Sequence, residues 1–206
     1  MSAAQPLPAP VDPRTMDHFV HLRVGWQGYR QLVAMRGESS VPRITYLNGV
    51  VELMAPSRYH EIDKTRFARL LETWSEIAGV PLEGYGSWTL EEENEDRAAE
   101  PDECYTVRRV VKSDDERPDI ALEVVWTSGG INKLEVYRKL GVREVWFYER
   151  GKLRFFALRR EAHDEVYREI PRSERVPELP IDTLLACIKE PDQTSAVRAL
   201  RAALAG

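Results

Sequence analysis

Two acidic residues and one lysine are the side chains in this sequence whose types and spacing are best suited to chemistry. Asp102 stands in the segment Glu100-Pro101-Asp102, directly before a strand-like run, and Glu123 lies in the middle of a second such run. Lys133 follows at the start of a predicted helix. Carboxylates on adjacent strands can hold Mg²⁺ or Mn²⁺, which prefer oxygen ligands, and a lysine beside them can stabilise charge on a phosphate. The set therefore outlines a metal-dependent site for phosphodiester hydrolysis.

Each of the two acids also has a purely structural interpretation. Side chains alternate across a strand, so Glu123 shares one face of the run 119–126 with Asp119, Ala121 and Val125. That face is either exposed to solvent or the floor of a cleft. The pair Pro101-Asp102 can equally form a turn whose carboxylate accepts backbone N–H bonds. Taken singly, both interpretations of each acid stay open.

Helical geometry turns Lys133 inward. At about 100° per residue, the buried stripe of the predicted helix runs through Leu134, Tyr137 and Leu140. Lys133 falls on this inward side, whereas Lys139 projects away. An inward lysine either extends its ammonium group to solvent or meets an anionic partner, and both alternatives remain.

The same projection singles out a histidine at the head of a long predicted helix, 59–78. Its apolar stripe runs through Phe67, Leu71 and Trp74, and the stripe continues back to His60 and Asp63. Glu61 points elsewhere. His60 is then either a capping or core histidine, or a group that contacts the site.

The elements that position these residues follow from periodicity and turn signals. Predicted helices cover 25–36, 59–78, 131–140 and two segments within 181–204, broken near Pro191. Predicted strands are 44–47, 50–54, 83–90, 103–111, 118–126, 144–148 and 153–158, with Asn48-Gly49 as the turn of a hairpin. The acidic run 91–96 is expected to be a solvated loop. From 59 to 148 the order is αβββαβ, and the helix between two strands indicates a crossover and a mixed sheet.

Composition predicts one domain with arms. Residues 1–13 are rich in Ala and Pro and are expected to be a flexible arm, 14–180 the main domain, and 181–206 a helical extension. No apolar run reaches the roughly 18 residues of a membrane span, and Cys104 and Cys187 form no metal or disulfide pattern. A cytoplasmic protein is expected. The net charge of −5 disfavours non-specific coating of nucleic acid but does not exclude a nuclease, which needs only local positive charge.

Several sequence motifs between Tyr46 and Leu158 together resemble those of a known protein family. The chain is similar over about Tyr46 to Leu158 to the Uma-two family of restriction endonucleases, in the form abundant in cyanobacteria. The resemblance implies a fold of the α/β (α+β) class, with the restriction-endonuclease-like αβββαβ core of the PD-(D/E)XK nuclease superfamily. The residues that carry it are Asn48-Gly49, Met54-Ala55-Pro56-Ser57, His60-Glu61, Glu100 to Tyr105, Pro118 to Gly130, Lys133 to Tyr137 and Gly141 to Trp146.

The resemblance also assigns roles. It makes Asp102 the acid of the PD element and Glu123 the acid of (D/E)XK, while Val125 stands where that motif has its lysine. Lys133 fills the lysine's place from the following helix, and His60 occupies the family's histidine. The implied cofactor is Mg²⁺ or Mn²⁺ bound by the two acids and the backbone carbonyl of Val125.

The implied activity is endonucleolytic cleavage of DNA, with RNA as an alternative substrate and a homodimer as the expected assembly. The rival hypothesis is a non-catalytic nucleic-acid-binding or assembly module that retains the fold.

Overall fold

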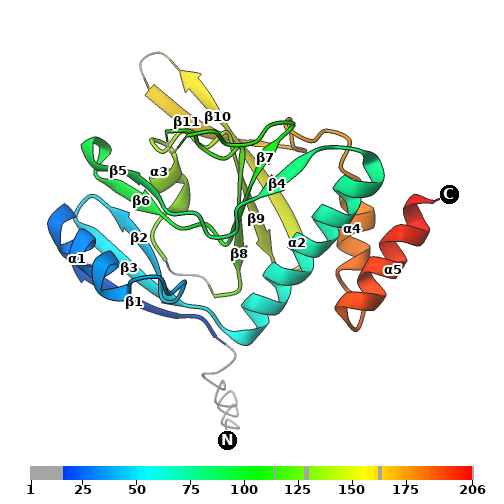
Figure 1. The fold of residues 1–206 in the computed structure, drawn as a ribbon, viewed down its shortest axis with the longest axis horizontal. Coiled ribbons are helices and arrows are strands. Elements are labelled where there is room, and N and C mark those ends of the chain that lie inside the picture. The colour runs from blue at the N-terminus through cyan, green and yellow to red at the C-terminus, as the bar shows by residue number, and fades with distance from the viewer. Residues whose placement is uncertain (1–15, 114, 128–129, 162–163, 206) are drawn as a thin grey trace, which may run out of the picture.

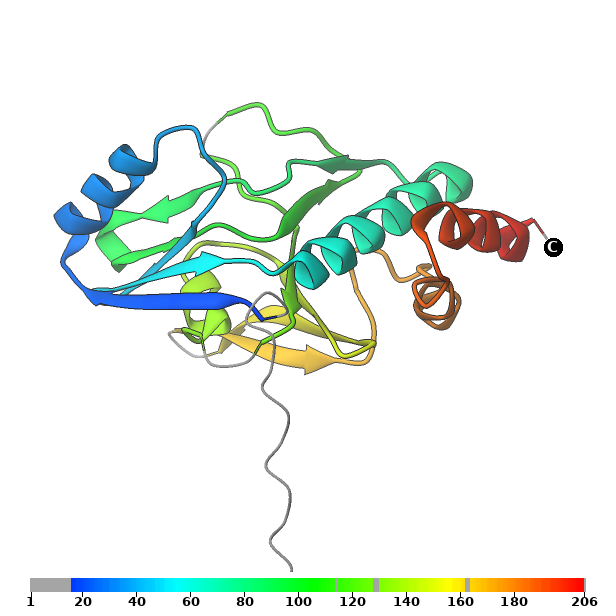
Figure 2. The same ribbon diagram turned by 90° about the horizontal axis from the view of Figure 1, so that it is seen from below.

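The computed structural model describes residues 16–113, 115–127, 130–161 and 164–205. Two β-sheets lie side by side, with a long helix crossing one end of the molecule (Figure 1). Figure 2 shows one helix packed on the outer side of the first sheet and three gathered at the opposite end. The five helices are α1 (Trp26–Arg36), α2 (Arg58–Ala78), α3 (Lys133–Tyr137), α4 (Ile181–Cys187) and α5 (Gln193–Leu204).

The first sheet is antiparallel and has the strand order β1-β3-β2-β6-β5. Its centre is the hairpin predicted around Asn48-Gly49, whose residues have φ of 46° and 83°. Positive φ at both positions is what a tight hairpin turn requires, so the prediction is confirmed. The strands are β1 (His18–Arg23), β2 (Arg43–Leu47), β3 (Val50–Ala55), β5 (Leu90–Glu92) and β6 (Arg97–Ala99).

The second sheet is mixed and has the order β11-β10-β9-β8-β7-β4. Strands β8 and β9 are parallel, and α3 lies in the crossover between them. Along this sheet the chain runs α2-β4-β7-β8-α3-β9, which confirms the predicted αβββαβ order. The strands are β4 (Leu82–Gly84), β7 (Glu103–Val107), β8 (Ile120–Val125), β9 (Glu144–Glu149), β10 (Lys152–Glu161) and β11 (Asp164–Ile170).

Helix α2 is fixed by its caps and its apolar stripe. The Ser57 side chain accepts a hydrogen bond from His60 N, and Gly79 ends the helix with φ of 65°, a conformation that glycine adopts without a Cβ clash. The stripe packs on the face of β8 that carries alternate apolar residues. The opposite face of β8 is also covered, since Ala121 packs with Val136 and Tyr137 from α3. Glu123 therefore projects from a strand that is buried on both faces.

Several predicted boundaries are wrong. The predicted strand 83–90 is two short strands, β4 and β5, which belong to different sheets. The acidic run 91–96, expected to be a solvated loop, is the end of β5 and a 3-10 turn (Glu93–Glu95) that connects β5 to β6; none of its residues is buried. The strand predicted over 103–111 ends at Val107, because Arg108 takes a φ of 58°. The helix predicted over 131–140 is α-helical only from Lys133 to Tyr137.

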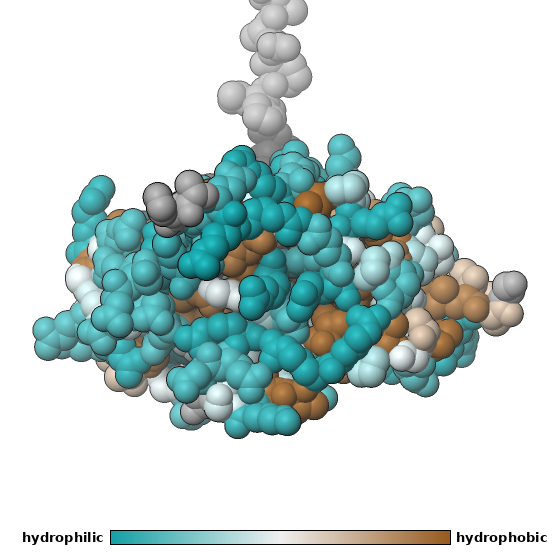
Figure 3. Space-filling model, turned by 90° about the horizontal axis from the view of Figure 1, so that it is seen from above, coloured by the Kyte–Doolittle hydropathy of each residue, from teal (hydrophilic) through white to brown (hydrophobic). Residues whose placement is uncertain are grey.

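Strand β6, in the interior of the first sheet, was not predicted, and neither were the two strands β1 and β11. Both lie at sheet edges and are partly exposed along their length. Their polar sequences, HFVHLR and DEVYREI, suit edges, where charge discourages further strand pairing. The side of the molecule that carries β10 and β11 is largely hydrophilic, with small separate apolar patches (Figure 3).

The two ends of the chain were predicted to be an N-terminal arm and a C-terminal helical extension. The arm 1–13 lies outside the described residues. Helices α4 and α5 form as predicted, and they contribute Leu184 and Leu200 to the same core as α2. A boundary at residue 180 stays a prediction. Within the described ranges, none of the helices combines the length and apolar character needed to cross a membrane.

The packing of α5 on α2 leads to a stability prediction. Leu200 is fully buried in the main core, so Leu200→Ala should lower the free energy of unfolding by about 2–5 kcal/mol. Arg201→Ala removes an exposed ion pair with Glu76 and should cost no more than about 1 kcal/mol. Urea denaturation of both variants measures the difference. Equal, small losses would show that α5 is not part of the cooperative core.

Candidate active site

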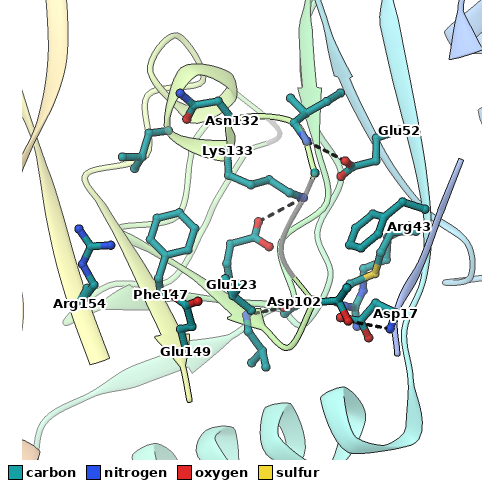
Figure 4. A pocket seen from close by; sticks show the side chains of 18 of the residues that line it. Asp17, Arg43, Glu52, Asp102, Glu123, Asn132, Lys133, Phe147, Glu149 and Arg154 are labelled. Atoms are coloured by element: carbon teal, nitrogen blue, oxygen red, sulfur yellow. Dashed lines mark hydrogen bonds and ion pairs between the residues drawn. The ribbon is translucent and has the colours of Figure 1, made fainter. Parts of the chain in front are cut away.

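A cavity of about 450 Å³ opens where the two sheets meet, and Figure 4 shows its lining side chains. Charged groups project into it from both sheets and from α3. They are Asp17, Arg43, Glu52, Asp102, Glu123, Lys133, Glu149 and Arg154. Apolar side chains, among them Phe147 and Phe156, complete the wall. The three residues that sequence analysis placed first, Asp102, Glu123 and Lys133, all line this one cavity.

Strand register places the two predicted acids together. Glu103 of β7 pairs with Leu122 of β8 in antiparallel register. One step further, Asp102 stands level with Glu123, and residues opposite each other in an antiparallel pair project to the same face. The interpretation of Glu123 as the floor of a cleft is therefore the correct one, and solvent exposure is excluded because the residue is 6% exposed.

Asp102 is buried and contacts groups from three elements. Its Oδ2 accepts a hydrogen bond from Val124 N at 2.6 Å. Its Oδ1 forms an ion pair with the Arg43 guanidinium of β2 and lies 3.0 Å from His60 Nε2 of α2. The turn interpretation of Pro101-Asp102 was thus partly right, since the carboxylate does accept a backbone N–H, but from the neighbouring strand.

His60 lies behind Asp102 rather than in the cavity. Its side chain is fully buried, and its Nδ1 lies 3.3 Å from Asp17 Oδ2. Asp17 Oδ1 in turn accepts from Ser57 N at 2.8 Å. Burial raises the pKa of Asp17, but the hydrogen bonds from His60 and Ser57 outweigh it and leave the pKa below its usual value. Asp17 is therefore an anion that fixes the imidazole.

Glu123 is oriented by a tyrosine and a lysine from α3. Tyr137 donates its hydroxyl to Glu123 Oε1 at 2.5 Å, and Lys133 Nζ lies 3.6 Å from the same oxygen. Lys133 also donates to Thr45 Oγ1 of β2 at 2.8 Å. Burial, followed by the charge and hydrogen bond of Glu123, raises the pKa of Tyr137 well above its usual value, so this hydroxyl remains a donor. The inward lysine does have an anionic partner, and Lys139 projects away to Asp164 as predicted.

The remaining candidates lie around the site. Glu61, predicted to point away from the stripe, is partly exposed and accepts from Arg43 Nη2 at 3.0 Å. Burial raises the pKa of Asp63, which does not line the cavity. Burial also raises the pKa of Cys104 to about 12, so its thiol is protonated at neutral pH and unsuited to nucleophilic chemistry.

Arg43 and Glu52 are cavity residues that sequence analysis missed. Arg43 lies on β2, whose first four residues are all buried, so no alternation marks its direction. Glu52 is an acidic residue in an apolar hairpin strand, at 1% exposure. A charged residue inside an otherwise apolar strand was the available signal for Glu52, whereas Arg43 is the first residue of its strand and carried no such signal.

The oxygen donors fit a hard divalent cation. Among the described residues, no group of three or more His, Cys, Asp or Glu side chains forms a metal-holding cluster. Mg²⁺ and Mn²⁺ need only one or two carboxylates together with water and phosphate oxygens. Asp102 Oδ2 carries one hydrogen bond and retains a lone pair. The hydrogen bond and ion pair described for Glu123 both fall on Oε1, which leaves Oε2 for a ligand.

The fold is of the restriction-endonuclease-like class. Among solved structures, the chain is similar to a protein of Anabaena variabilis described as a "putative nuclease belonging to DUF820". The identity is 11%, the TM-score 0.50, and the match covers 81% of this chain and 96% of that one.

The family model named Uma2, "Putative restriction endonuclease", matches residues 26–188. The chain belongs to this family, which confirms the resemblance seen in the sequence. A comparison with curated proteins finds no match.

The buried Asp102–Arg43 pair leads to a second prediction. Arg43→Met leaves Asp102 without its cation and should lower the free energy of unfolding by about 3–5 kcal/mol. Arg30→Met removes an exposed ion pair with Glu91 and should cost at most about 1 kcal/mol. Chemical denaturation at neutral pH compares the two. Equal losses would contradict the role given to Arg43 in balancing the charge of Asp102.

Proposed function

We propose that this protein is a metal-dependent endonuclease that hydrolyses phosphodiester bonds in DNA. The observation that carries the proposal is the convergence of three groups on one cavity. Asp102 and Glu123 project from adjacent strands to the same face, and the Lys133 ammonium lies 3.6 Å from Glu123. Family membership and fold support a nuclease, and this geometry supports its dependence on a metal.

The metal ligands in this proposal are Asp102, Glu123 and one backbone carbonyl. Bound Mg²⁺ or Mn²⁺ would polarise the scissile phosphate and lower the pKa of a bound water. The carbonyl predicted from the sequence is that of Val125. Because Val124 N points to Asp102 and the N–H and C=O of one strand residue share a side, the Val124 carbonyl points to the Asp102 side as well. We therefore favour the carbonyl of Val124 over that of Val125.

Of the other side chains in this proposal, Lys133 contacts the substrate, whereas Tyr137 and His60 orient the two acidic residues. Lys133 stabilises negative charge developing on the phosphate, because its ammonium reaches the cavity beside Glu123. Tyr137 fixes Glu123 Oε1 and so directs Oε2 to a ligand. His60, for which the sequence left open a capping or core role and a contact with the site, is fully buried and acts in this proposal as a positioning residue for Asp102.

Cleavage of both strands of a duplex generally requires two sites, so a homodimer is part of the proposal. Sedimentation in the presence of duplex DNA tests it. The cytoplasmic location stays a prediction.

A cleavage assay with matched variants tests the proposed function. With Mg²⁺ or Mn²⁺ and plasmid DNA, Asp102→Asn, Glu123→Gln and Lys133→Met should each lower the cleavage rate by about 10²-fold or more. Lys139→Met is the control, because Lys139 lies two residues after α3 and pairs with Asp164 outside the cavity. It should cleave at the wild-type rate.

Two results would contradict the proposal. Full activity in all three site variants would place the chemistry elsewhere. DNA binding without cleavage by the folded wild-type protein, with either metal, would favour the non-catalytic binding or assembly module. Running RNA and DNA of the same sequence in parallel decides between the two substrates.

A further inference from the structure

We propose that Glu52 is a further catalytic residue of this site, and that it accepts a proton from the attacking water. The inference rests on the proposed nuclease function. It starts from a buried carboxylate with an unused oxygen. Glu52 is 1% exposed and lines the cavity, and its Oε1 is without a hydrogen bond among the described residues.

An unused buried carboxylate oxygen needs an explanation, because desolvating it without a partner costs about 1–3 kcal/mol or more. The polar contacts by which Glu52 stabilises the fold are made by its other oxygen, Oε2. Oε2 accepts from Ile131 N at 2.7 Å and lies 3.0 Å from His21 Nε2. The carboxylate thus ties the segment after β8 to the first sheet through Oε2 alone. Oε1 is itself buried, in the wall of the cavity that Glu52 lines.

The position of Glu52 follows from the register of the first sheet. Glu52 is opposite His21 on one side and opposite Thr45 on the other, so all three side chains share one face. Thr45 receives the hydrogen bond of Lys133. Figure 4 shows the Glu52 carboxylate and the Lys133 ammonium directed into the same space, with the Glu123 carboxylate below them. Glu52 therefore faces the two acids of the second sheet across the cavity.

A role as a third ligand of the same metal is less suitable. Among the described residues, Glu52 does not form a metal-holding cluster with Asp102 and Glu123. A carboxylate that faces the site without belonging to the ligand set suits proton transfer. The charged groups around it are His21 from β1, Arg43 from β2, Asp102 before β7, Glu123 from β8 and Lys133 from α3.

The step balances as a hydrolysis. An O–H bond of water breaks and its proton passes to Glu52 Oε1, while the water oxygen forms a bond to phosphorus. The bond from phosphorus to the leaving oxygen breaks, and that oxygen takes a proton from solvent. Glu52 then returns its proton to solvent. Positioned proton transfer of this kind contributes about 10²–10⁴-fold in rate.

Single-turnover cleavage of an oligonucleotide duplex with Mn²⁺ tests the inference. Glu52→Gln should cleave about 10²-fold more slowly, with DNA affinity and melting temperature close to wild type. Raising the pH from about 7 to about 9 supplies hydroxide and should recover more of the rate in Glu52→Gln than in wild type.

The control is Glu144→Gln, since Glu144 is equally buried but hydrogen-bonded through both oxygens, away from the cavity. Its rate should be unchanged.

A second variant keeps the test decisive if Glu52→Gln does not fold. A Cβ at Gly130 would lie 2.6 Å from Glu52 Oε2, so Gly130→Ala must displace the carboxylate while keeping its charge. It should also slow cleavage without weakening DNA binding.

Three outcomes decide the matter. Slow cleavage in the folded Glu52→Gln and Gly130→Ala variants supports the inference. Wild-type rates in whichever of the two folds overturn it while leaving the proposed function intact. An inactive wild-type protein overturns both, and the wild-type control makes that failure distinct.

Discussion

The site depends on the neutralisation of one buried carboxylate, that of Asp102. Arg43 comes from the first sheet, Val124 N from the second and His60 from α2. Because a buried charge without partners is strongly destabilising, these three elements can reach their positions only together. The docking of the two sheets and the assembly of the site are therefore the same event.

The same pairing of acid and base across elements recurs around the cavity. Glu123 of β8 meets Lys133 of α3, and Glu52 of β3 meets His21 of β1. Asp17, directly before β1, meets His60 of α2. The first two pairs join elements that line the cavity, and the third ties Asp17 of the cavity wall to α2 behind it. The charges that chemistry would use therefore also position the wall. The cavity is thereby held by charge on one side and by aromatic packing of Phe147 and Phe156 on the other.

Much of this arrangement is local and was predictable from the sequence. The period of two along β8 and of 3.6 along α3 gave the faces on which Glu123 and Lys133 lie, and Asn48-Gly49 marked the turn of the hairpin. The partners were not predictable, because Arg43 and Asp102 are 59 residues apart and Glu52 and Ile131 are 79 apart. No periodicity encodes such separations. The edge strands β1 and β11 were missed for a different reason, since polar residues that protect an edge resemble those of a loop.

The most direct test of metal binding by Asp102 and Glu123 is the anomalous scattering of Mn²⁺ in crystals of the protein. We expect one strong peak in the cavity, about 2.2 Å from an oxygen of Asp102 and from Glu123 Oε2, with the Val124 carbonyl as a further ligand. We also expect that peak to be lost in Glu123→Gln. A fully occupied Mn²⁺ elsewhere in the molecule, with the Asp102–Arg43 pair unchanged and the cavity holding only water, would contradict it.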